Sequence, residues 1–205
     1  MERLAVMEKR IRSVETSDAD AVRDIYAPFV SDSATSFEAA PPDAAEMKKR
    51  IQDLRDQYPW LVFEEDGRVQ AYAYASPHRA RHAYQWSVEV SVYVHSVAHR
   101  RGIGRALYTT LFEVLRRQGY VNAYAGITLP NPASVQLHES MGFTTVGVFD
   151  RIGFKFGKWH DTAWLQLRLI QASASVPDPI PVNRFLDKES ILSMFEGCAR
   201  TVRLD

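Results

Sequence analysis

The chain has 205 residues, of which 46% are hydrophobic and 24% charged, so it can form an apolar core and is not disordered throughout. Its 25 Lys and Arg residues balance 25 Asp and Glu residues, which argues against a general nucleic-acid binder with an electropositive face. The single cysteine, Cys198, cannot form an internal disulfide or a cysteine metal cluster. Because no apolar run reaches membrane-spanning length and no secretory signal is recognisable, we expect a soluble cytoplasmic protein that binds no membrane.

The first half of the chain predicts three strands and two helices. Strands are expected at residues 11–14, 60–64 and 69–76, and helices at residues 16–26 and 44–55. Pro28 is expected to end the first helix, because proline has no backbone N–H to donate. The polar, irregular segment 31–40 contains Phe37. The Asp66-Gly67 pair predicts a hairpin turn, because both residue types tolerate positive φ angles.

The second half predicts four more strands and two more helices. The strands are expected at residues 88–95, 121–128, 143–149 and 159–169, and the helices at residues 106–117 and 131–141. Gly142 is a typical residue after a helix C-terminus. Two loops are predicted, a basic one at residues 77–84 and a glycine- and lysine-containing one at residues 151–158.

The character of the chain changes after Ile170. Small polar residues at 171–175 predict a linker, and the prolines of residues 176–181 favour an extended connector. One weak helix is possible at residues 184–198. We therefore divide the chain into an extension (1–10), a domain (11–170) and a proline-containing linker with a tail (171–205). The tail is expected to be a packing arm or a disordered appendage rather than a catalytic domain.

A basic turn, His99-Arg100-Arg101-Gly102-Ile103-Gly104-Arg105, connects the strand at 88–95 to the next helix. The first backbone N–H groups of a helix are unpaired and the helix dipole is positive there, so this turn predicts an anion cradle. It is not a Walker loop, which needs Gly-Lys-Ser/Thr, nor a Rossmann fingerprint, because Leu107 replaces the third glycine. A tight strand-to-helix turn without a ligand explains this segment equally well.

The order of these pieces, followed by Asn131-x-x-Ser134-x-x-Leu137-His138 and Gly142-Phe143, resembles the GNAT superfamily of acyl-CoA N-acyltransferases over residues 11–169. Within it, the chain is most similar to phosphinothricin and methionine sulfoximine N-acetyltransferases. Four segments carry that narrower resemblance: Ala83-Tyr84-Gln85-Trp86-Ser87-Val88-Glu89, Ser91-Val92-Tyr93-Val94, Leu129-Pro130-Asn131-Pro132-Ala133-Ser134-Val135, and Gly153-Phe154-Lys155-Phe156-Gly157-Lys158-Trp159-His160-Asp161.

The resemblance implies an α/β (α+β) fold: a mixed, twisted central sheet with helices on both faces, split between its fourth and fifth strands to admit acetyl-CoA. It implies that the backbone of Val92, Tyr93 and Val94 pairs with the pantetheine arm like an added strand. The pyrophosphate is expected on the turn formed by Arg100, Arg101, Gly102, Ile103, Gly104 and Arg105. Asn131 and Ser134 would lie along the pantetheine. His99 stands where the family usually has Gln or Arg.

Two residues are candidates for proton transfer, which an amine acetylation requires at the attacking nitrogen and at the departing sulfur. Glu89 matches the family's active-site carboxylate and would take the ammonium proton or hold the ammonium group; alternation alone favours an exposed strand carboxylate. His138 matches the histidine of the phosphinothricin-type enzymes and would act as base or acid. The alternative for His138 is a packed histidine on a short helix. A backbone N–H near Val92 would polarise the thioester carbonyl.

Acceptor recognition is expected from side chains of the irregular and basic loops. Arginine forks match carboxylates, although an exposed basic loop without a ligand is equally consistent with this composition. The expected acceptor-binding residues are Phe37, Arg79, Arg81, His82, Tyr84 and Tyr108. No metal is expected; we interpret Trp159-His160-Asp161 as structural or as part of a pocket built by a dimer.

Three functions are consistent with the sequence. The first is acetyl-CoA-dependent N-acetylation of a small amino acid such as phosphinothricin, methionine sulfoximine or methionine sulfone, by direct transfer. The second is acetylation of another amine, such as an ordinary amino acid, a polyamine or a protein N-terminus. The third is a non-catalytic acyl-CoA sensor with the tail as a partner arm. The resemblance also suggests a homodimer.

Overall fold

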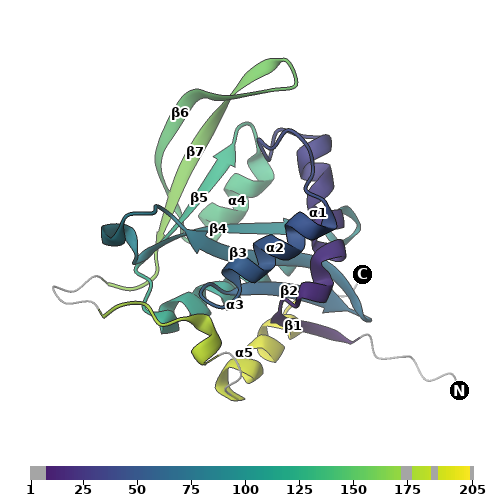
Figure 1. The fold of residues 1–205 in the computed structure, drawn as a ribbon, viewed down its shortest axis with the longest axis vertical. Helices are drawn as coiled ribbons and strands as arrows, with labels where there is room; N and C mark the ends of the chain where they lie inside the picture. Colours follow the sequence, from purple (N-terminus) through teal and green to yellow (C-terminus); the bar gives the residue numbers. More distant parts are fainter. Residues whose placement is uncertain (1–7, 172–176, 186–188, 204–205) are drawn as a thin grey trace, which may run out of the picture.

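The computed structural model describes residues 8–171, 177–185 and 189–203, and its centre is one seven-stranded mixed sheet (Figure 1). The strand order is β1-β2-β3-β4-β5-β7-β6. The strands are β1 (Lys9–Ser13), β2 (Trp60–Glu65), β3 (Arg68–Pro77), β4 (Ser87–Val94), β5 (Asn122–Thr128), β6 (Thr144–Lys155) and β7 (Lys158–Arg168). The helices are α1 (Ala19–Ser31), α2 (Ala44–Leu54), α3 (Ile103–Gln118), α4 (Pro132–Ser140) and α5 (Glu189–Arg200).

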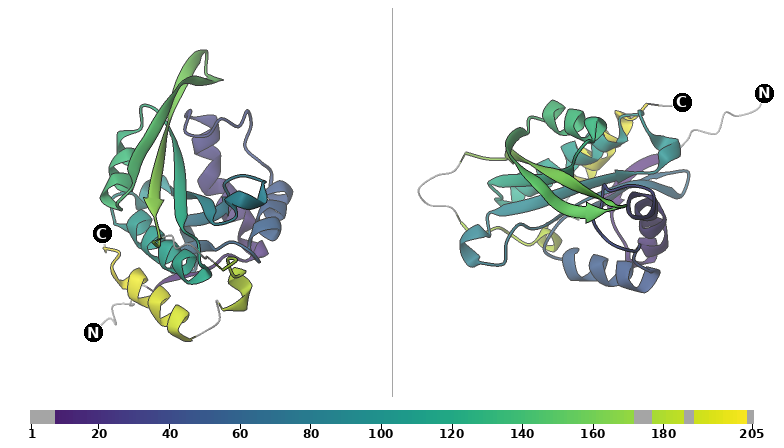
Figure 2. Two further views of the ribbon diagram at one scale, coloured as in Figure 1. Left: turned by 90° about the vertical axis from the view of Figure 1, so that its left-hand side faces the viewer. Right: turned by 90° about the horizontal axis from the view of Figure 1, so that it is seen from above.

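Helices cover both faces of the sheet, as expected (Figure 2). On one face, α1 and α2 bury Val22 and Ile51 against the aromatic side chains of β2 and β3. On the other face, α3 buries Leu107 and Leu111 against alanine and valine side chains of β3, β4 and β5. The small residues of β3 let α3 approach the sheet closely, and the two apolar clusters supply most of the burial that stabilises the domain.

The sheet splits between β4 and β5. These strands run parallel and pair only at residues 87–89 and 122–124, at the beginning of each strand. Beyond these pairs β4 stays bonded to β3, and β5 stays bonded to β7 up to Thr128. On the side of β4 that faces β5, the backbone from Val90 onward therefore has no neighbouring strand to pair with. This arrangement confirms the predicted split between the fourth and fifth strands.

Helix α1 does not end at Pro28 as the sequence predicts; it continues to Ser31. Pro28 is exposed, so the carbonyl that lacks its N–H partner is on the solvent side of the helix. Tyr26 and Val30 flank the proline and are both buried in the core. Burial of these two side chains outweighs the cost of about 3 kcal/mol for proline inside a helix.

The loop predicted at residues 151–158 is wrong, because β6 and β7 form one long hairpin through this segment. Only Phe156 and Gly157 form the turn, with φ angles of 50° and 74°. The hairpin extends beyond the rest of the molecule in Figures 1 and 2. Residue 153 lies inside strand β6 and is a glycine because a Cβ atom there would collide with the ring of Phe37.

The C-terminal tail is packed on the domain over its described residues. Helix α5 contacts β1 and α3 and buries Ile191, Phe195 and Ala199 in the α3-side core. The expected linker at residues 171–175 lies almost wholly outside the described residues. Among the helices that the model describes, none is long and apolar enough to cross a membrane.

Candidate active site

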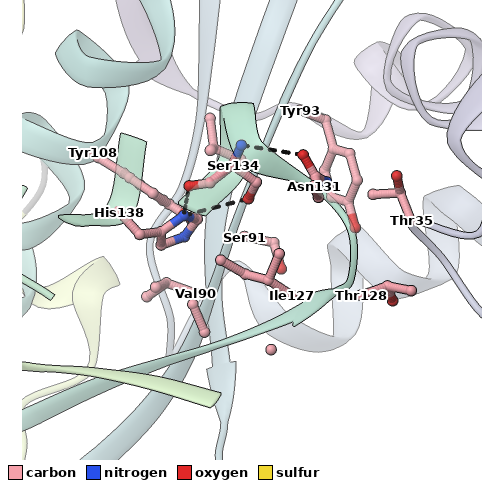
Figure 3. A pocket seen from close by; sticks show the side chains of 13 residues that line it. Thr35, Val90, Ser91, Tyr93, Tyr108, Ile127, Thr128, Asn131, Ser134 and His138 are labelled. Carbon is pink, nitrogen blue, oxygen red and sulfur yellow. Dashed lines mark hydrogen bonds between the residues drawn. The ribbon is translucent and has the colours of Figure 1, made fainter. Parts of the chain in front are cut away.

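A cleft occupies the split between β4 and β5 (Figure 3). Its walls are residues 90–93 of β4 and residues 125–128 of β5. Three residues of the α4 region, Asn131, Ser134 and His138, line it on one side, and Thr35 of the α1–α2 loop lines it on the other. The cleft therefore passes through the sheet and is open to groups from both faces.

The two candidate proton-transfer residues lie on opposite faces of the sheet. Val88 and Val90 point into the α3-side core, whereas Tyr93 packs with the α1-side cluster. Because side chains alternate along a strand, Glu89 and Ser91 point to the α1 side. His138 is on α4 and contacts the α3-side core through Tyr108 and Phe143. Glu89 and His138 thus do not form a pair; the split separates them.

His138 is 4% exposed and both of its ring nitrogens have partners. Nδ1 lies 2.7 Å from the carbonyl oxygen of Ser134, so it must donate, and Nε2 lies 3.0 Å from the hydroxyl of Tyr108. The neutral ring with its proton on Nδ1 therefore accepts a hydrogen bond from Tyr108 at Nε2. Burial lowers the pKa of His138 below its ordinary 6.5, although the bond to Ser134 opposes this shift, so the ring is neutral at pH 7.

Local sequence positions His138 in this way. The side chain of Asn131 caps α4 by accepting the N–H of Ser134 at 3.1 Å, and Pro132 fits the first turn. One helical turn separates Ser134 from His138, which brings the ring against the Ser134 carbonyl. Tyr108 is fully buried on α3, and burial raises its pKa far above 10, so its hydroxyl stays protonated.

Glu89 has a partner that the sequence analysis did not single out. Oε1 of Glu89 lies 3.0 Å from Nδ1 of His78, whose ring stacks on Tyr124 at 4.5 Å between centroids. Trp164 lies edge-on to the same imidazole at 5.8 Å. The register of β3 and β4 pairs Ser76 with Glu89, so residue 78 falls on the same face beside residue 87. His78 could have been found from the sequence only with that register known.

The turn before α3 has the geometry of an anion cradle. Arg100 and Gly102 have φ angles of 64° and 86°, and Gly102 is the N-cap of α3. In the described structure no side chain caps this helix, so its first N–H groups are available to a ligand. Ile103 is buried beneath the turn and Gly104 packs against Leu137, so these two residues contribute backbone only.

Only part of the predicted basic patch faces outward. Arg101 is 7% exposed, and its guanidinium is bound to both carboxylate oxygens of Glu65, so its side chain does not join the patch. Arg100 is exposed, and Arg105 reaches Ser140 of α4 at 2.8 Å. His99 donates from Nε2 to the carbonyl of Val94 at 3.0 Å and thereby closes the end of β4.

The three β4 residues expected to pair with the pantetheine arm, Val92, Tyr93 and Val94, differ in what surrounds them. Val92 and Tyr93 line the cleft, and Val94 ends β4. The Tyr93 ring packs edge-on against Tyr26 and Phe29, each at 5.1 Å, so it anchors β4 to α1.

The structure separates the expected acceptor-binding residues into three places. Tyr108 lines the cleft next to His138 on the α3 side, apart from Phe37 and Tyr84, and its expected contact with the acceptor stays a prediction. Phe37 is 43% exposed and lies against the β6–β7 hairpin. The remaining four residues line a second cavity of about 450 Å³ at the end of β3: Arg79, Arg81, His82 and Tyr84. Tyr84 contacts His78 edge-on at 6.1 Å, which connects this cavity to Glu89.

The Trp159-His160-Asp161 segment is structural within one chain. His160 is 6% exposed and donates from Nε2 to the carbonyl of Lys155 at 3.1 Å. Asp161 accepts the backbone N–H of Arg151 at 2.8 Å. Lys155 donates in turn to the carbonyls of Val30 and Ser36, which fastens the hairpin to the loop that carries Thr35.

Comparisons with known proteins agree with this geometry. A family model described as an acetyltransferase (GNAT) domain matches residues 11–164. A phosphinothricin N-acetyltransferase of Streptomyces viridochromogenes is 41% identical over 156 residues, 76% of this chain and 85% of the relative. An L-methionine sulfoximine/L-methionine sulfone acetyltransferase of Salmonella typhimurium is 35% identical over 166 residues, 80% and 96% of the two chains.

A solved structure has the same fold. It is a phosphinothricin acetyltransferase from Sinorhizobium meliloti in complex with acetyl-CoA, with a TM-score of 0.78 and 34% identity. The match covers 82% of this chain and 92% of that one.

Proposed function

The chain belongs to the GNAT family of acetyltransferases, and we propose that it transfers the acetyl group of acetyl-CoA to the α-amino group of a small amino acid of the phosphinothricin, methionine sulfoximine or methionine sulfone type. The observation that carries the proposal is the cleft at the β4–β5 split, which the neutral His138 lines and next to which Glu89 lies, in the last residue pair between the two strands.

The donor would enter from the α3 end of the split. The unpaired edge of β4 at Val92 to Val94 offers backbone groups to the amide-rich pantetheine, and the N–H groups at Gly102 to Arg105 offer donors to the pyrophosphate. Arg100 and Arg105 add positive charge at the rim. Asn131 and Ser134 line the cleft, in which the thioester would lie between the two faces.

Proton transfer would be divided between the two faces. Glu89 receives the first proton of the acceptor ammonium, so that the nitrogen lone pair can attack the thioester carbon. His138 takes the second nitrogen proton at Nε2 and returns it to the sulfur as the C–S bond breaks. The products are an N-acetyl amino acid, CoA and one proton. Tyr108 keeps Nε2 in the accepting form until then, and His78 orients the Glu89 carboxylate.

The acceptor would lie on the α1 side, next to Glu89. Its anionic groups are drawn to Arg79, Arg81 and His82 of the basic loop, since guanidinium forks bind carboxylates and phosphinates in two-point contacts. Tyr84 and Phe37 would border this side.

A homodimer in the cytoplasm is part of the proposal. Strand β6 is one of the two outer strands of the sheet, and the β6–β7 hairpin carries large apolar side chains that are each 50% exposed or more: Val146, Val148, Phe149, Ile152, Phe154, Phe156 and Trp159. An apolar edge strand of this length is a pairing surface, and a second copy of the chain would cover it.

An acceptor panel tests the proposed reaction. The purified protein is given acetyl-CoA with phosphinothricin, methionine sulfoximine, methionine sulfone, ordinary amino acids, a polyamine or a peptide, and released thiol is measured. We expect the highest kcat/KM with the first three acceptors and intersecting lines in double-reciprocal plots, as direct transfer requires. A higher kcat/KM for another amine would replace the acceptor class. CoA binding without thiol release from any acceptor would identify a sensor.

A further inference from the structure

The described tail, residues 177–185 and 189–203, lies outside the segment 11–164 that the family model matches. It is joined to the domain by hydrogen bonds to its backbone. Gln118 of α3 accepts the N–H of Ile180 and donates to its carbonyl, each at 2.8 Å. The N–H of Val182 bonds to Gln57. Together with the buried face of α5, these contacts direct the end of the chain toward the beginning of α3 (Figure 1).

The last described residue, Arg203, contacts the basic turn at residues 99–105. This turn is called the phosphate turn below, because the proposed function places the pyrophosphate there. The N–H of Arg203 donates to the carbonyl of Arg101 at 3.0 Å, and Nε of Arg101 donates to the carbonyl of Arg203 at 3.3 Å. Lys9 of β1 donates to the carbonyls of Val202 and Arg203 at 3.2 and 3.1 Å. Residue 101 therefore makes a reciprocal pair of hydrogen bonds with the tail.

The position of Arg101 within the turn makes this contact functionally important. Arg101 lies between Arg100 and Gly102, the two residues of the turn with positive φ angles. Its side chain is fixed on the other side by Glu65, whose pKa is lowered by the hydrogen bond from Arg101. Residue 101 of the turn is thus held by Glu65 of β2 and by the tail.

We propose that the C-terminal segment around Arg203 is a positioning element that keeps the phosphate turn in the conformation that binds the donor. This inference rests on the proposed function, in which the turn holds the pyrophosphate of acetyl-CoA. A turn that is already ordered before binding does not lose entropy when the donor binds, so the tail raises donor affinity without touching the donor. The contact uses backbone atoms of Arg203, so its side chain is dispensable.

Two substitutions at one position test the proposal in the full-length protein. Arg203→Pro removes the N–H that donates to Arg101, whereas Arg203→Ala keeps it. Calorimetric titration with CoA and steady-state kinetics are then compared. We expect Arg203→Pro to weaken CoA binding and to raise KM for acetyl-CoA about fivefold, the effect of one lost hydrogen bond. Its kcat and its KM for the acceptor stay unchanged, and Arg203→Ala resembles the unmodified protein.

A truncated donor separates positioning from general destabilisation. S-acetylpantetheine lacks the pyrophosphate, so its KM is expected to be the same in Arg203→Pro and in the unmodified protein. Hydrogen exchange is expected to quicken at residues 100–105 of Arg203→Pro and not in α2.

Four results would overturn the proposal. They are unchanged CoA affinity in Arg203→Pro, an equal loss in Arg203→Ala, an equal loss with S-acetylpantetheine, and faster exchange spread over the whole domain. If the unmodified protein binds no CoA, the proposed function fails first and this proposal fails with it.

Discussion

The proton state of His138 is determined by its immediate surroundings. The Ser134 carbonyl fixes the proton on Nδ1, and Tyr108 supplies a hydrogen bond to Nε2 that a substrate proton can replace. His138 was singled out by the resemblance to the phosphinothricin-type enzymes of the GNAT superfamily. The sequence did not predict the role of Tyr108, because the distance between α3 and α4 depends on how both helices pack on the sheet.

Replacing Glu89 with Gln is expected to lower kcat about 100-fold or more, because the amide cannot take the ammonium proton. CoA affinity is expected to stay the same, since Glu89 faces the acceptor side of the split. Stopped-flow or steady-state thiol release measures kcat, and titration calorimetry measures the affinity. The exposed Glu139→Gln on α4 is the matched control with full activity. Unchanged turnover in Glu89→Gln at neutral pH would remove Glu89 from the mechanism.

The pH profile tests the role of His138. Because burial lowers its pKa below 6.5, the ring is neutral at pH 7 and becomes protonated only as the pH falls below 6.5. We expect kcat/KM to be level above that pH and to fall in acid, when Nε2 can no longer accept a proton. In His138→Asn the rate is expected to be about 100-fold lower, and the fall in kcat/KM is expected to begin at a lower pH, where only protonation of Glu89 limits the rate. An acid limb that begins at the same pH in the variant would assign it to another group.

At the scale of the elements, the spacing of hydrophobic residues was sufficient to predict those helices and strands that bury one amphipathic face in the core. Helix α2 and the β2–β3 hairpin are found where the sequence predicts them, because their signals are local. The predictions failed where distant contacts override local propensity: Pro28 lies inside α1, and Gly153 lies inside β6. The Phe37 ring that makes glycine necessary at residue 153 is more than a hundred residues away in the chain.

Replacing exposed apolar side chains of the β6–β7 hairpin with charged ones is expected to change the oligomeric state of the protein. Phe154→Lys combined with Trp159→Lys places charge on the apolar hairpin, so we expect the proposed homodimer to dissociate into monomers. Multi-angle light scattering after size exclusion measures the mass. Lys48→Glu, at an exposed site on α2, is the control that stays dimeric. A monomeric unmodified protein, or a dimer that survives both lysines, would exclude this surface.

At the scale of the whole molecule, ion pairs connect β1, β2 and the phosphate turn. Arg12 holds Asp18 and Glu64, and Glu65 holds Arg101 and lies 3.8 Å from Lys9. Composition alone gives a net charge of zero and cannot show this arrangement, because the partners lie far apart in the sequence. Arg101 was expected to face the ligand for the same reason, because its partner Glu65 is distant in the sequence.

Acid is expected to destabilise the whole domain through these carboxylates. The pKa of Glu65 is lowered in the folded state by its hydrogen bond from Arg101, so its stabilisation is complete above about pH 4.5 and is lost as the pH falls further. Thermal unfolding between pH 7 and pH 3 measures this loss. Glu65→Gln is expected to be about 3 kcal/mol less stable at pH 7 and to depend less on pH, because the buried guanidinium of Arg101 loses the carboxylate of Glu65. A parallel pH dependence in both proteins would contradict this assignment.

The most direct test of the account is a crystal structure with CoA and an acceptor amino acid bound. The account predicts pantetheine in the split beside Val92 to Val94 and the pyrophosphate on the N–H groups of Gly102 to Arg105. It also predicts the sulfur on the His138 side and the acceptor nitrogen within hydrogen-bond reach of Glu89. CoA bound elsewhere, or an acceptor whose nitrogen lies away from Glu89, would contradict it.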